Sequence, residues 1–269
     1  MPDYPSIRLD RVLIQNGYCS PRSARTLLRN HVAQVNGVRV FEGSILVSPT
    51  RDIISLDGNV LDLKNNVYLM MNKCANTVCT SLSDSHTTVF DLVDEKYKNI
   101  SGLGKLHSVG RLDRDTEGLL LLTTNGSFSH SLCTPEKHVS KTYLVYLRDY
   151  VSEEKRSEYC QRLKEGIFIE AEKKAKSALT KSAHLEWLSE QEAVEQNPSS
   201  NGENHLYTAC RLTITEGKFH QVKRMFAALG NEVIYLKRIA LGKLSLDPAL
   251  LPGEYREMTA EELMLLMEQ

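Results

Sequence analysis

The fold is decided by residues 110–126, GRLDRDTEGLLLLTTNG. Two acids and two arginines lie close together near its start, and an apolar run follows them directly. Such a run between turn-forming residues is typical of a buried β-strand, and the Asn125-Gly126 pair after it predicts a turn. Asp113 and Asp115 would share one face if the backbone there is extended, and would lie on opposite faces of a tight turn. A charged surface loop that leads into a core strand is the plain alternative.

The composition excludes several classes of protein. A chain of 269 residues with 41% hydrophobic content can bury a substantial core, in one large domain or in two unequal ones. The six cysteines are scattered and include no Cys-x-x-Cys pair, so neither a structural zinc site nor a disulfide framework is expected. The sequence has no secretory signal pattern and no apolar run long enough to span a bilayer. We therefore expect a cytoplasmic protein without a metal site.

Charge is sorted along the chain, although 34 acidic residues nearly cancel 33 basic ones. Residues 1–51 carry seven arginines and three acids, and residues 217–238 carry five basic residues and one acid, so each segment has a net charge of +4. A near-neutral chain with two basic segments is typical of a protein that contacts phosphate groups with particular surfaces.

The N-terminal residues predict two short helices, the second of them basic. An amphipathic helix is expected over residues 7–15, and Ser20 is expected as the N-cap of a second helix that begins at Pro21. Three arginines recur on the second helix at i, i+3 and i+7, with no acid between them: Arg22, Arg25 and Arg29. Such a stripe would follow a phosphate backbone, and a solvated helix face is the alternative.

A β-hairpin is predicted over residues 32–40, where Asn36-Gly37 joins two short alternating runs. With its two helices and this hairpin, the segment from residue 7 to about residue 56 resembles the small S4-like RNA-binding domain. The resemblance implies an RNA partner and adds Arg8 and Ser20 to the expected RNA contacts. We expect this domain to span residues 1–60, a turn-rich linker to span 61–66, and a second domain to span 67–269.

Beyond residue 66 the pattern predicts strands and helices in succession. Strands are expected at residues 67–73, 78–81, 141–147, 167–169 and 206–215, and helices at residues 89–93, 127–133, 152–165 and from about 259. Residues 189–205 have almost no apolar content and are interpreted as a flexible insertion.

Two further stretches carry chemically useful side chains. The strand at 141–147 puts Lys141 and Tyr143 on one face, where a tyrosine that only fills the core is the alternative. The segment EGKFHQVKRMFAALG, residues 216–230, predicts a helix with one buried face that ends at Gly230. Four polar residues cluster around its first turn beside a glycine loop that favours anions: His220, Gln221, Lys223 and Arg224. A basic helix end without a ligand is the competing interpretation.

Taken together, residues 110–126, the Lys141-x-Tyr143 strand and residues 217–225 resemble the three signature motifs of the pseudouridine synthases that modify ribosomal RNA. With the N-terminal domain, the resemblance covers nearly the whole chain, and residues 251–256 are similar to the group that modifies the small subunit. It implies an α+β fold, with the S4-like domain followed by a larger domain on a mixed, mainly antiparallel sheet with flanking helices.

The resemblance also implies an activity. It implies isomerisation of one uridine of 16S ribosomal RNA, with position 516 as the expected target, to pseudouridine. The expected partner is this RNA or an assembly intermediate of the small subunit, and the protein is expected to act as a monomer, without a cofactor, a metal or a membrane. A uridine of 23S ribosomal RNA is the alternative target.

The reaction itself explains why a single carboxylate would suffice. The C1′–N1 bond of uridine breaks, the base turns, and C1′ joins C5, so that one acid can serve as the nucleophile toward the sugar or as the base that removes a sugar proton. The resemblance places this acid at Asp113. It also places a cation that would keep the acid ionised at Lys223.

The remaining roles come from the same resemblance. Arg111 would occupy the gap that the flipped nucleotide leaves in the RNA. Tyr143 would stack on the extruded base and help to move the C5 proton, Ile214 would cover the other face of the base, and Asp115 would be structural. RNA contacts are expected from Arg8, Ser20, Arg22, Arg25, Arg29, Lys141, His220, Gln221 and Arg224. One departure from the family pattern is visible at residues 72–76, where Asn-Lys-Pro-x-Gly is replaced by Asn-Lys-Cys-Ala-Asn.

Two rival functions remain open at this point. One is a glycosidase-like hydrolase that uses Asp113 and Asp115 as a carboxylate pair, although such pairs usually come from separate elements about 5–9 Å apart. The other is a non-catalytic RNA-binding factor for ribosome assembly. The joint presence of an acid, an aromatic residue and a base at the three motif positions argues against the second rival.

Overall fold

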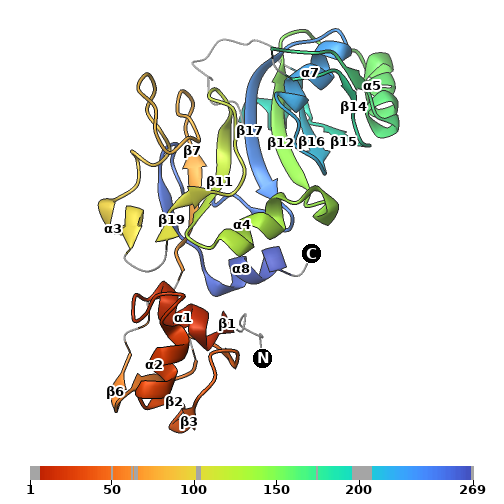
Figure 1. The fold of residues 1–269 in the computed structure, drawn as a ribbon. Helices are drawn as coiled ribbons and strands as arrows, with labels where there is room; N and C mark the ends of the chain where they lie inside the picture. Colours follow the sequence, from red (N-terminus) through yellow and green to blue (C-terminus); the bar gives the residue numbers. More distant parts are fainter. Residues whose placement is uncertain are drawn as a thin grey trace. The chain divides into compact units, whose positions relative to one another are not determined.

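The computed structural model describes residues 7–49, 51–61, 63, 66–100, 104–173, 175–195 and 208–267 (Figure 1). The chain divides into two compact units. The first comprises Met1–Tyr68, Val93–His107 and Leu122–Gly126, and the second comprises Leu69–Leu92, Ser108–Leu121 and Ser127–Gln269. The first unit therefore includes residues 67–68, 93–107 and 122–126, which were expected to belong to the second domain.

The N-terminal part of the first unit consists of two helices and small antiparallel sheets. Helix α1 is Leu9–Gln15 and helix α2 is Ala24–Asn30. Four strands pair in the order β3-β2-β5-β6: β2 Ala33–Val35, β3 Val38–Val40, β5 Ile54–Leu56 and β6 Asn59–Val60. Strand β1, Ile7–Arg8, pairs with β4, Leu46–Val47. Buried apolar side chains from both helices and from the strands form one core: Leu9, Val12, Leu13, Leu28, Ala33, Val47 and Ile54.

Turn geometry in this region confirms one prediction and corrects others. Asn36 and Gly37 both have positive φ, 51° and 79°, which is the geometry of the expected tight hairpin turn. A second such pair, Asp57-Gly58, joins β5 and β6, so part of the polar stretch after residue 56 is a hairpin. Helix α2 begins at Ala24, not at Pro21, although the Ser20 hydroxyl still accepts a hydrogen bond from the Ser23 N–H at 3.2 Å.

The second unit is built on a nine-stranded sheet in the order β15-β16-β12-β17-β11-β7-β19, with β10 beside β11 and β18 beside β17 (Figure 1). Its strands are β7 Tyr68–Lys73, β10 His107–Ser108, β11 Glu117–Thr123, β12 Lys141–Leu147, β15 His184–Trp187, β16 Thr208–Ile214, β17 Val233–Leu241, β18 Leu244–Ser245 and β19 Tyr255–Glu257. Strands β11 and β17 are parallel, whereas β12 is antiparallel to both of its neighbours. The expected mixed, mainly antiparallel sheet is confirmed.

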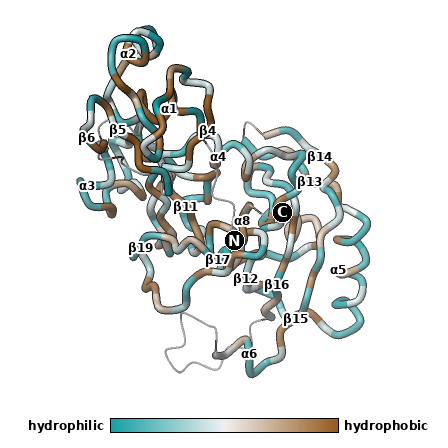
Figure 2. The backbone as a smooth tube through the Cα atoms, turned by 90° about the horizontal axis from the view of Figure 1, so that it is seen from below, coloured by the Kyte–Doolittle hydropathy of each residue, from teal (hydrophilic) through white to brown (hydrophobic). Residues whose placement is uncertain are grey.

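Short helices and one small hairpin accompany this sheet. They are α4 Gly126–Cys133, the 3-10 turn η1 Pro135–Lys137, α5 Glu153–Glu165, α6 Glu190–Glu195, α7 Gln221–Ala228, α8 Ala260–Met267, and the pair β13 Phe168–Ile169 with β14 Ala178–Leu179. Figure 2 shows α5 largely in hydrophilic colours, and only Tyr159 and Leu163 of this helix are buried. None of the helices in the described part of the chain is long and apolar enough to cross a membrane.

Several local expectations were wrong. The expected strand at 78–81 is reduced to one bridge between Val78 and Thr88. The expected helix at 89–93 is a series of turns, and a short helix, α3, follows at Glu95–Lys98, before the hairpin of β8, Asn99–Ile100, with β9, Gly104–Lys105. At Asn125-Gly126, where a turn was expected, the chain passes directly from β11 into α4, which begins at Gly126.

The segment expected to be a flexible insertion is partly a helix. Residues 190–195 form α6, in which Ala193 is buried and accepts a hydrogen bond from the Tyr146 hydroxyl at 2.6 Å. The sequence pattern missed this contact because it depends on a tyrosine of a distant strand. Residues 196–205 of the expected insertion, and residues 206–207 of the strand expected after it, lie outside the described residues.

The departure at residues 74–76 ends on a backbone conformation that glycine also adopts readily. Asn76 stands where the family pattern has glycine, and it has a positive φ of 64°. Asparagine is one of the few residues other than glycine that enter this left-handed region readily.

Gly118 in β11 allows the sheet backbone to approach closely at the point where the site will form. It pairs with Arg238 of β17, has a φ of 96°, and a Cβ atom added to it would lie 2.2 Å from the Arg238 carbonyl oxygen. Only glycine fits both the dihedral angle and the space.

We predict that Gly118→Ala destabilises the protein by about 3 kcal/mol, because it combines a left-handed backbone with a main-chain clash. Denaturant unfolding followed by circular dichroism measures this loss. Gly126→Ala is the matched control, since no heavy atom lies within 4 Å of the added Cβ. Equal stability of the two variants would contradict the argument.

Candidate active site

A cavity of about 470 Å³ opens in the second unit, within the usual size range of small-ligand sites. Its lining comes from the loop before β11, from β12, from the segment that links β16 to α7, and from β17. Six residues of chemical interest are among those that line it: Arg111, Asp113, Lys141, Tyr143, Ile214 and Arg238. Five of these were expected site residues, and Arg238 was not.

A tight turn directs the two acids of the opening stretch into different surroundings. The Thr116 N–H donates to the Asp113 carbonyl at 3.1 Å, which closes a turn over residues 113–116. Asp113 lines the cavity, whereas Asp115 lines a separate hollow beside α7. Of the two arrangements that the sequence left open, the tight turn is therefore the correct one.

A fully buried lysine holds this turn in place. Lys73, at the end of β7, is 0% exposed, and its ammonium donates to the carbonyls of Thr116 at 2.8 Å, Arg114 at 3.2 Å and Cys74 at 3.1 Å. Burial lowers the pKa of Lys73, and the three carbonyl contacts supply hydrogen bonds that water would otherwise give. The turn that follows Asp113 is thus tied to the central sheet.

Asp113 is a carboxyl group whose burial is only partly balanced by positive charge. Its side chain is 29% exposed. Desolvation raises its pKa above the ordinary value, while the charges of His220 and Lys223 act in the opposite direction. Asp113 is therefore a partly desolvated carboxyl group near the side chains of His220 and Lys223.

His220 lies between two carboxyl groups. Its Nε2 is 3.8 Å from Asp113 Oδ1, and its Nδ1 is 2.9 Å from Oε1 of Glu172, a residue of the segment between β13 and β14. The ring also stacks on Phe219, with centroids 3.8 Å apart, and the His220 backbone is left-handed with a φ of 48°. The segment before α7 thus aims the imidazole at the Asp113 turn, and Glu172 fixes its orientation.

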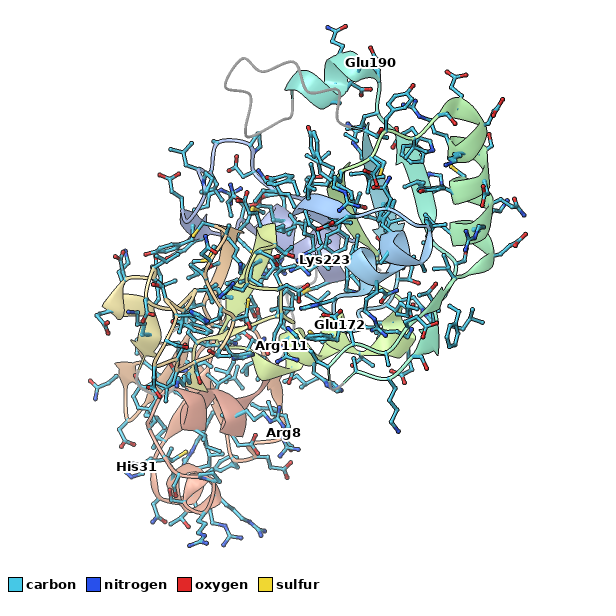
Figure 3. The ribbon with its side chains drawn as sticks, turned by 90° about the horizontal axis from the view of Figure 1, so that it is seen from above. Arg8, His31, Arg111, Glu172, Glu190 and Lys223 are labelled. Atoms are coloured by element: carbon cyan, nitrogen blue, oxygen red, sulfur yellow. The ribbon has the colours of Figure 1, made fainter. Side chains whose placement is uncertain are left out.

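Lys223 contacts a different acid from the one expected. Its ammonium lies 2.6 Å from both carboxylate oxygens of Asp115, and no direct pair with Asp113 occurs among the described residues. Burial alone would raise the pKa of Asp115, but the hydrogen bond and charge of Lys223 outweigh it and leave that pKa below its usual value. Figure 3 labels Lys223 with Arg111 and Glu172, which come from three separate segments of the unit. Lys223 was expected to keep Asp113 ionised, and its charge does lower the pKa of Asp113, but its direct contact is with Asp115 because the turn aims Asp115 at α7.

The floor of the cavity is formed by neighbouring strands. Lys141 pairs in register with Ile214, and Tyr143 pairs with Arg238, so these side chains converge from β12, β16 and β17. Burial raises the pKa of the Tyr143 phenol, and the charge of Arg238 opposes this rise. Burial and the nearby Arg238 lower the pKa of Lys141. Tyr143 is therefore a cavity residue and not only a core aromatic.

Two residues expected to bind RNA are used inside the protein. Arg224 is 7% exposed and donates to the main-chain carbonyls of Phe219 and Glu170 at 2.9 Å, and also to that of Lys176. Gln221 lines the cavity, but it is buried and bridges the Lys218 N–H and the Glu216 carboxylate. Both side chains therefore hold together the loops around α7.

Some of the residues of the first unit that were expected to contact RNA are paired within the protein, and others are exposed without an ion pair. Arg8 forms an ion pair with Asp10 at 2.6 Å, and the Ser20 hydroxyl bonds to Ser23. Three arginines are exposed and enter no ion pair with any residue in the described ranges: Arg22, Arg25 and Arg29. The stripe is thus exposed, although Arg22 precedes the helix.

Among the residues that the structure describes, no group of histidine, cysteine, aspartate and glutamate side chains is arranged to hold a metal ion.

With this geometry established, comparison with known proteins assigns the chain to a family. Residues 67–228 match the family model described as RNA pseudouridylate synthase. The chain belongs to this family. It is a pseudouridine synthase. The acid and the phenol that the motifs predicted line one cavity, and the basic helix lines both this cavity and a separate hollow.

Full-length relatives support the same assignment. The synthase is 38% identical over 97% of its length to an uncharacterised RNA pseudouridine synthase of Bacillus subtilis, of which it covers 99%. It is 36% identical to the ribosomal small subunit pseudouridine synthase A of Haemophilus influenzae, with 97% and 100% of the two chains covered. The corresponding protein of Pasteurella multocida is 39% identical, with 96% and 98% covered. A crystal structure of a pseudouridylate synthase matches with a TM-score of 0.61 and 37% identity, covering 97% of this chain and 100% of the other.

Sequence patterns did not predict three residues of the synthase's site. Lys73 and Arg238 each lie within an apolar strand, and a charge inside such a run could have signalled a special role. Glu172 lies in a polar stretch without periodicity, where its contact with His220 left no trace in the sequence.

We predict that Asp113→Asn raises the midpoint of thermal unfolding at pH 7, by roughly 2 °C. Because the folded pKa of Asp113 is raised, its carboxylate is less favourable in the folded state than in the unfolded chain, and the amide removes this cost. The gain should disappear as pH falls through the raised pKa, where the wild-type carboxyl is also neutral.

Asp115→Asn provides the matched control for this prediction. Its folded pKa is depressed, so its carboxylate stabilises the fold at neutral pH and the substitution should lower the unfolding midpoint. Calorimetry between pH 4 and pH 8 compares the two variants. Destabilisation by both at pH 7 would show that burial at Asp113 is compensated.

Proposed function

We propose that this synthase converts one uridine of small-subunit (16S) ribosomal RNA to pseudouridine, and that position 516 is the target. Support for the substrate comes from the full-length relatives that are named ribosomal small subunit pseudouridine synthase A and are 36–39% identical. The chemistry is supported by one observation above all, the meeting of Asp113 and Tyr143 in a single cavity. A uridine of 23S ribosomal RNA is the alternative substrate.

Asp113 is the catalytic acid of this proposal. As an ionised carboxylate it attacks C1′ of the flipped nucleotide or removes a proton from its sugar, and the C1′–N1 bond breaks as the base departs. Partial burial supports this role because a poorly solvated carboxylate is a stronger nucleophile and base. The charges of His220 and Lys223 oppose the rise that burial causes in its pKa and so favour the ionised form.

The base is held by the floor of the cavity. Tyr143 stacks on one face of the uracil, and Ile214, on the neighbouring strand, covers the other face. Arg111, two residues before Asp113 and exposed, takes the space that the flipped nucleotide leaves in the RNA. Lys141 lines the cavity, and His220 lies beside Asp113. Both side chains contact the adjoining RNA.

A hydrolase that uses both acids is disfavoured by the same geometry. Asp115 lines another hollow and is engaged by both contacts with Lys223, so it does not face a sugar held by Asp113. A non-catalytic assembly factor is disfavoured because the chain belongs to a family of synthases and retains an acid and a phenol in the cavity.

We predict that the purified protein forms pseudouridine at one site of a 16S RNA transcript or of a small-subunit assembly intermediate. Asp113→Asn should bind this RNA normally and lose product formation by at least about 10³-fold, because the reacting carboxylate is gone. Chemical mapping of pseudouridine at single-nucleotide resolution measures the product.

Asp115→Asn is the control, and it should retain measurable activity. Modification of a 23S transcript alone would overturn the proposed substrate. Undiminished product formation by Asp113→Asn would overturn the assignment of the catalytic acid.

We also predict that replacing Arg22, Arg25 and Arg29 together by glutamine weakens RNA binding and makes it less sensitive to salt. Three lost phosphate contacts should reduce the slope of log K against log salt by roughly 2–3. The measurement is filter binding of the rRNA fragment between 50 and 300 mM salt, roughly the range over which such contacts are resolved. Arg162→Gln, on the hydrophilic helix α5, is the control. An unchanged slope in the triple variant would identify the stripe as a solvated face.

A further inference from the structure

Arg238 is a buried cation that the mechanism above does not use. It lies in β17 directly opposite Tyr143 of β12, is 3% exposed, and lines the same cavity as Tyr143 and Asp113. Burying a guanidinium is costly unless its donors are paired or its charge is balanced. The burial of the Arg238 guanidinium therefore needs a physical explanation.

The pairing of this guanidinium is incomplete. Its Nε donates to the Leu119 carbonyl at 2.7 Å, but its Nη2 is fully buried and has no hydrogen-bond partner among the residues that the structure describes. The ion pairs found within the described ranges include none with Arg238. A strand arginine with only a structural role would normally have its donors satisfied.

The backbone fixes where this charge lies. Gly118 lets the β11 backbone approach Arg238 closely, and the Nε bond to Leu119 holds the guanidinium against the same strand. Antiparallel pairing with Tyr143 then places the phenol and the guanidinium side by side on the floor of the cavity. The phenol oxygen is thus the group best placed to present a negative charge to Arg238.

We propose that Arg238 is a positioning residue that acts through Tyr143, holding the phenol and balancing the charge of its phenolate while Tyr143 serves as the base that removes the C5 proton. This inference rests on the role proposed for Tyr143 and deepens it. Burial of Tyr143 by itself opposes phenolate formation, and the adjacent guanidinium counters that opposition.

The step is balanced as follows. Once C1′ is bonded to C5, that carbon carries both the sugar and its original hydrogen, and the ring has a C6=N1 double bond. The Tyr143 phenolate takes the C5 proton, and the electron pair of the C–H bond re-forms C5=C6. The C6=N1 pair moves onto N1, which takes up a proton from water, and Tyr143 returns its proton to water.

The test compares Arg238→Gln, which removes the charge, with Arg238→Lys, which keeps it. Full-length protein is incubated with 16S and 23S transcripts whose uridines carry hydrogen, deuterium or tritium at C5. Tritium release in single turnovers gives the rate, and the deuterium substrate gives the isotope effect on C5–H cleavage. The wild type is tested on both transcripts first, and the one from which it releases tritium is then used for every variant. An error in the proposed substrate would therefore not affect the test of Arg238.

Arg238→Gln should slow release by about 10²-fold and enlarge the isotope effect, because proton removal becomes rate-limiting. Arg238→Lys should restore a large part of the rate. In a Tyr143→Phe background, Arg238→Gln should have little further effect, since it acts through the missing phenol. Arg211→Gln, on the neighbouring strand β16 and paired with Glu186 and Glu192, is the control that should match the wild type.

Three results would overturn the proposal. The first is an unchanged isotope effect in Arg238→Gln despite a slower rate, which is the result expected of a structural residue. The second is a full additional loss in the Tyr143→Phe background. The third is a failure of Arg238→Lys to differ from Arg238→Gln when both variants show the wild-type thermal transition. If Arg238→Gln does not fold, Arg238→Lys in the two backgrounds decides by the same isotope and additivity criteria.

Discussion

The site depends on the contact between a buried ammonium group and the turn that carries the acids. Lys73 donates to the carbonyls of Arg114 and Thr116, and so ties the turn after Asp113 to the end of strand β7. Without such a tie, a turn with three charged residues in succession would be expected to lie in water. These hydrogen bonds fix the backbone of the turn, and a fixed backbone can hold the Asp113 carboxyl group partly out of water.

The charges around Asp113 act mostly from one step away. Lys223 is bound to Asp115, and Nδ1 of His220 is bound to Glu172, so each of these side chains already has a carboxylate partner of its own. Both still lower the pKa of Asp113, but neither neutralises it by a close ion pair. A directly paired carboxylate would be more stable and less reactive toward a sugar carbon, and one without nearby cations would be protonated more easily. The arrangement leaves Asp113 between these two limits.

Sequence patterns predicted the parts of this protein that depend on local rules. The hairpin at Asn36-Gly37, the strands at 68–73 and 141–147 and helix α7 follow from turn chemistry and from apolar periodicity, and all are present. The cavity residues Asp113 and Tyr143 were predicted through motif resemblance, which carries information about tertiary structure that periodicity lacks.

The errors share one physical cause, which is that tertiary contacts decide between locally similar alternatives. The partner of Lys223 depends on which way one turn faces, and spacing alone left that open for Asp113 and Asp115. Helix α6 forms from a polar stretch because Tyr146 and Ala193 meet across the sheet edge. Arg238 was counted only as part of a basic segment, although its neighbours in β17 are largely apolar. A charged residue within an apolar strand is explained by the groups that it faces in the fold. Arg238 faces the phenol of Tyr143, in a cavity that Asp113 also lines.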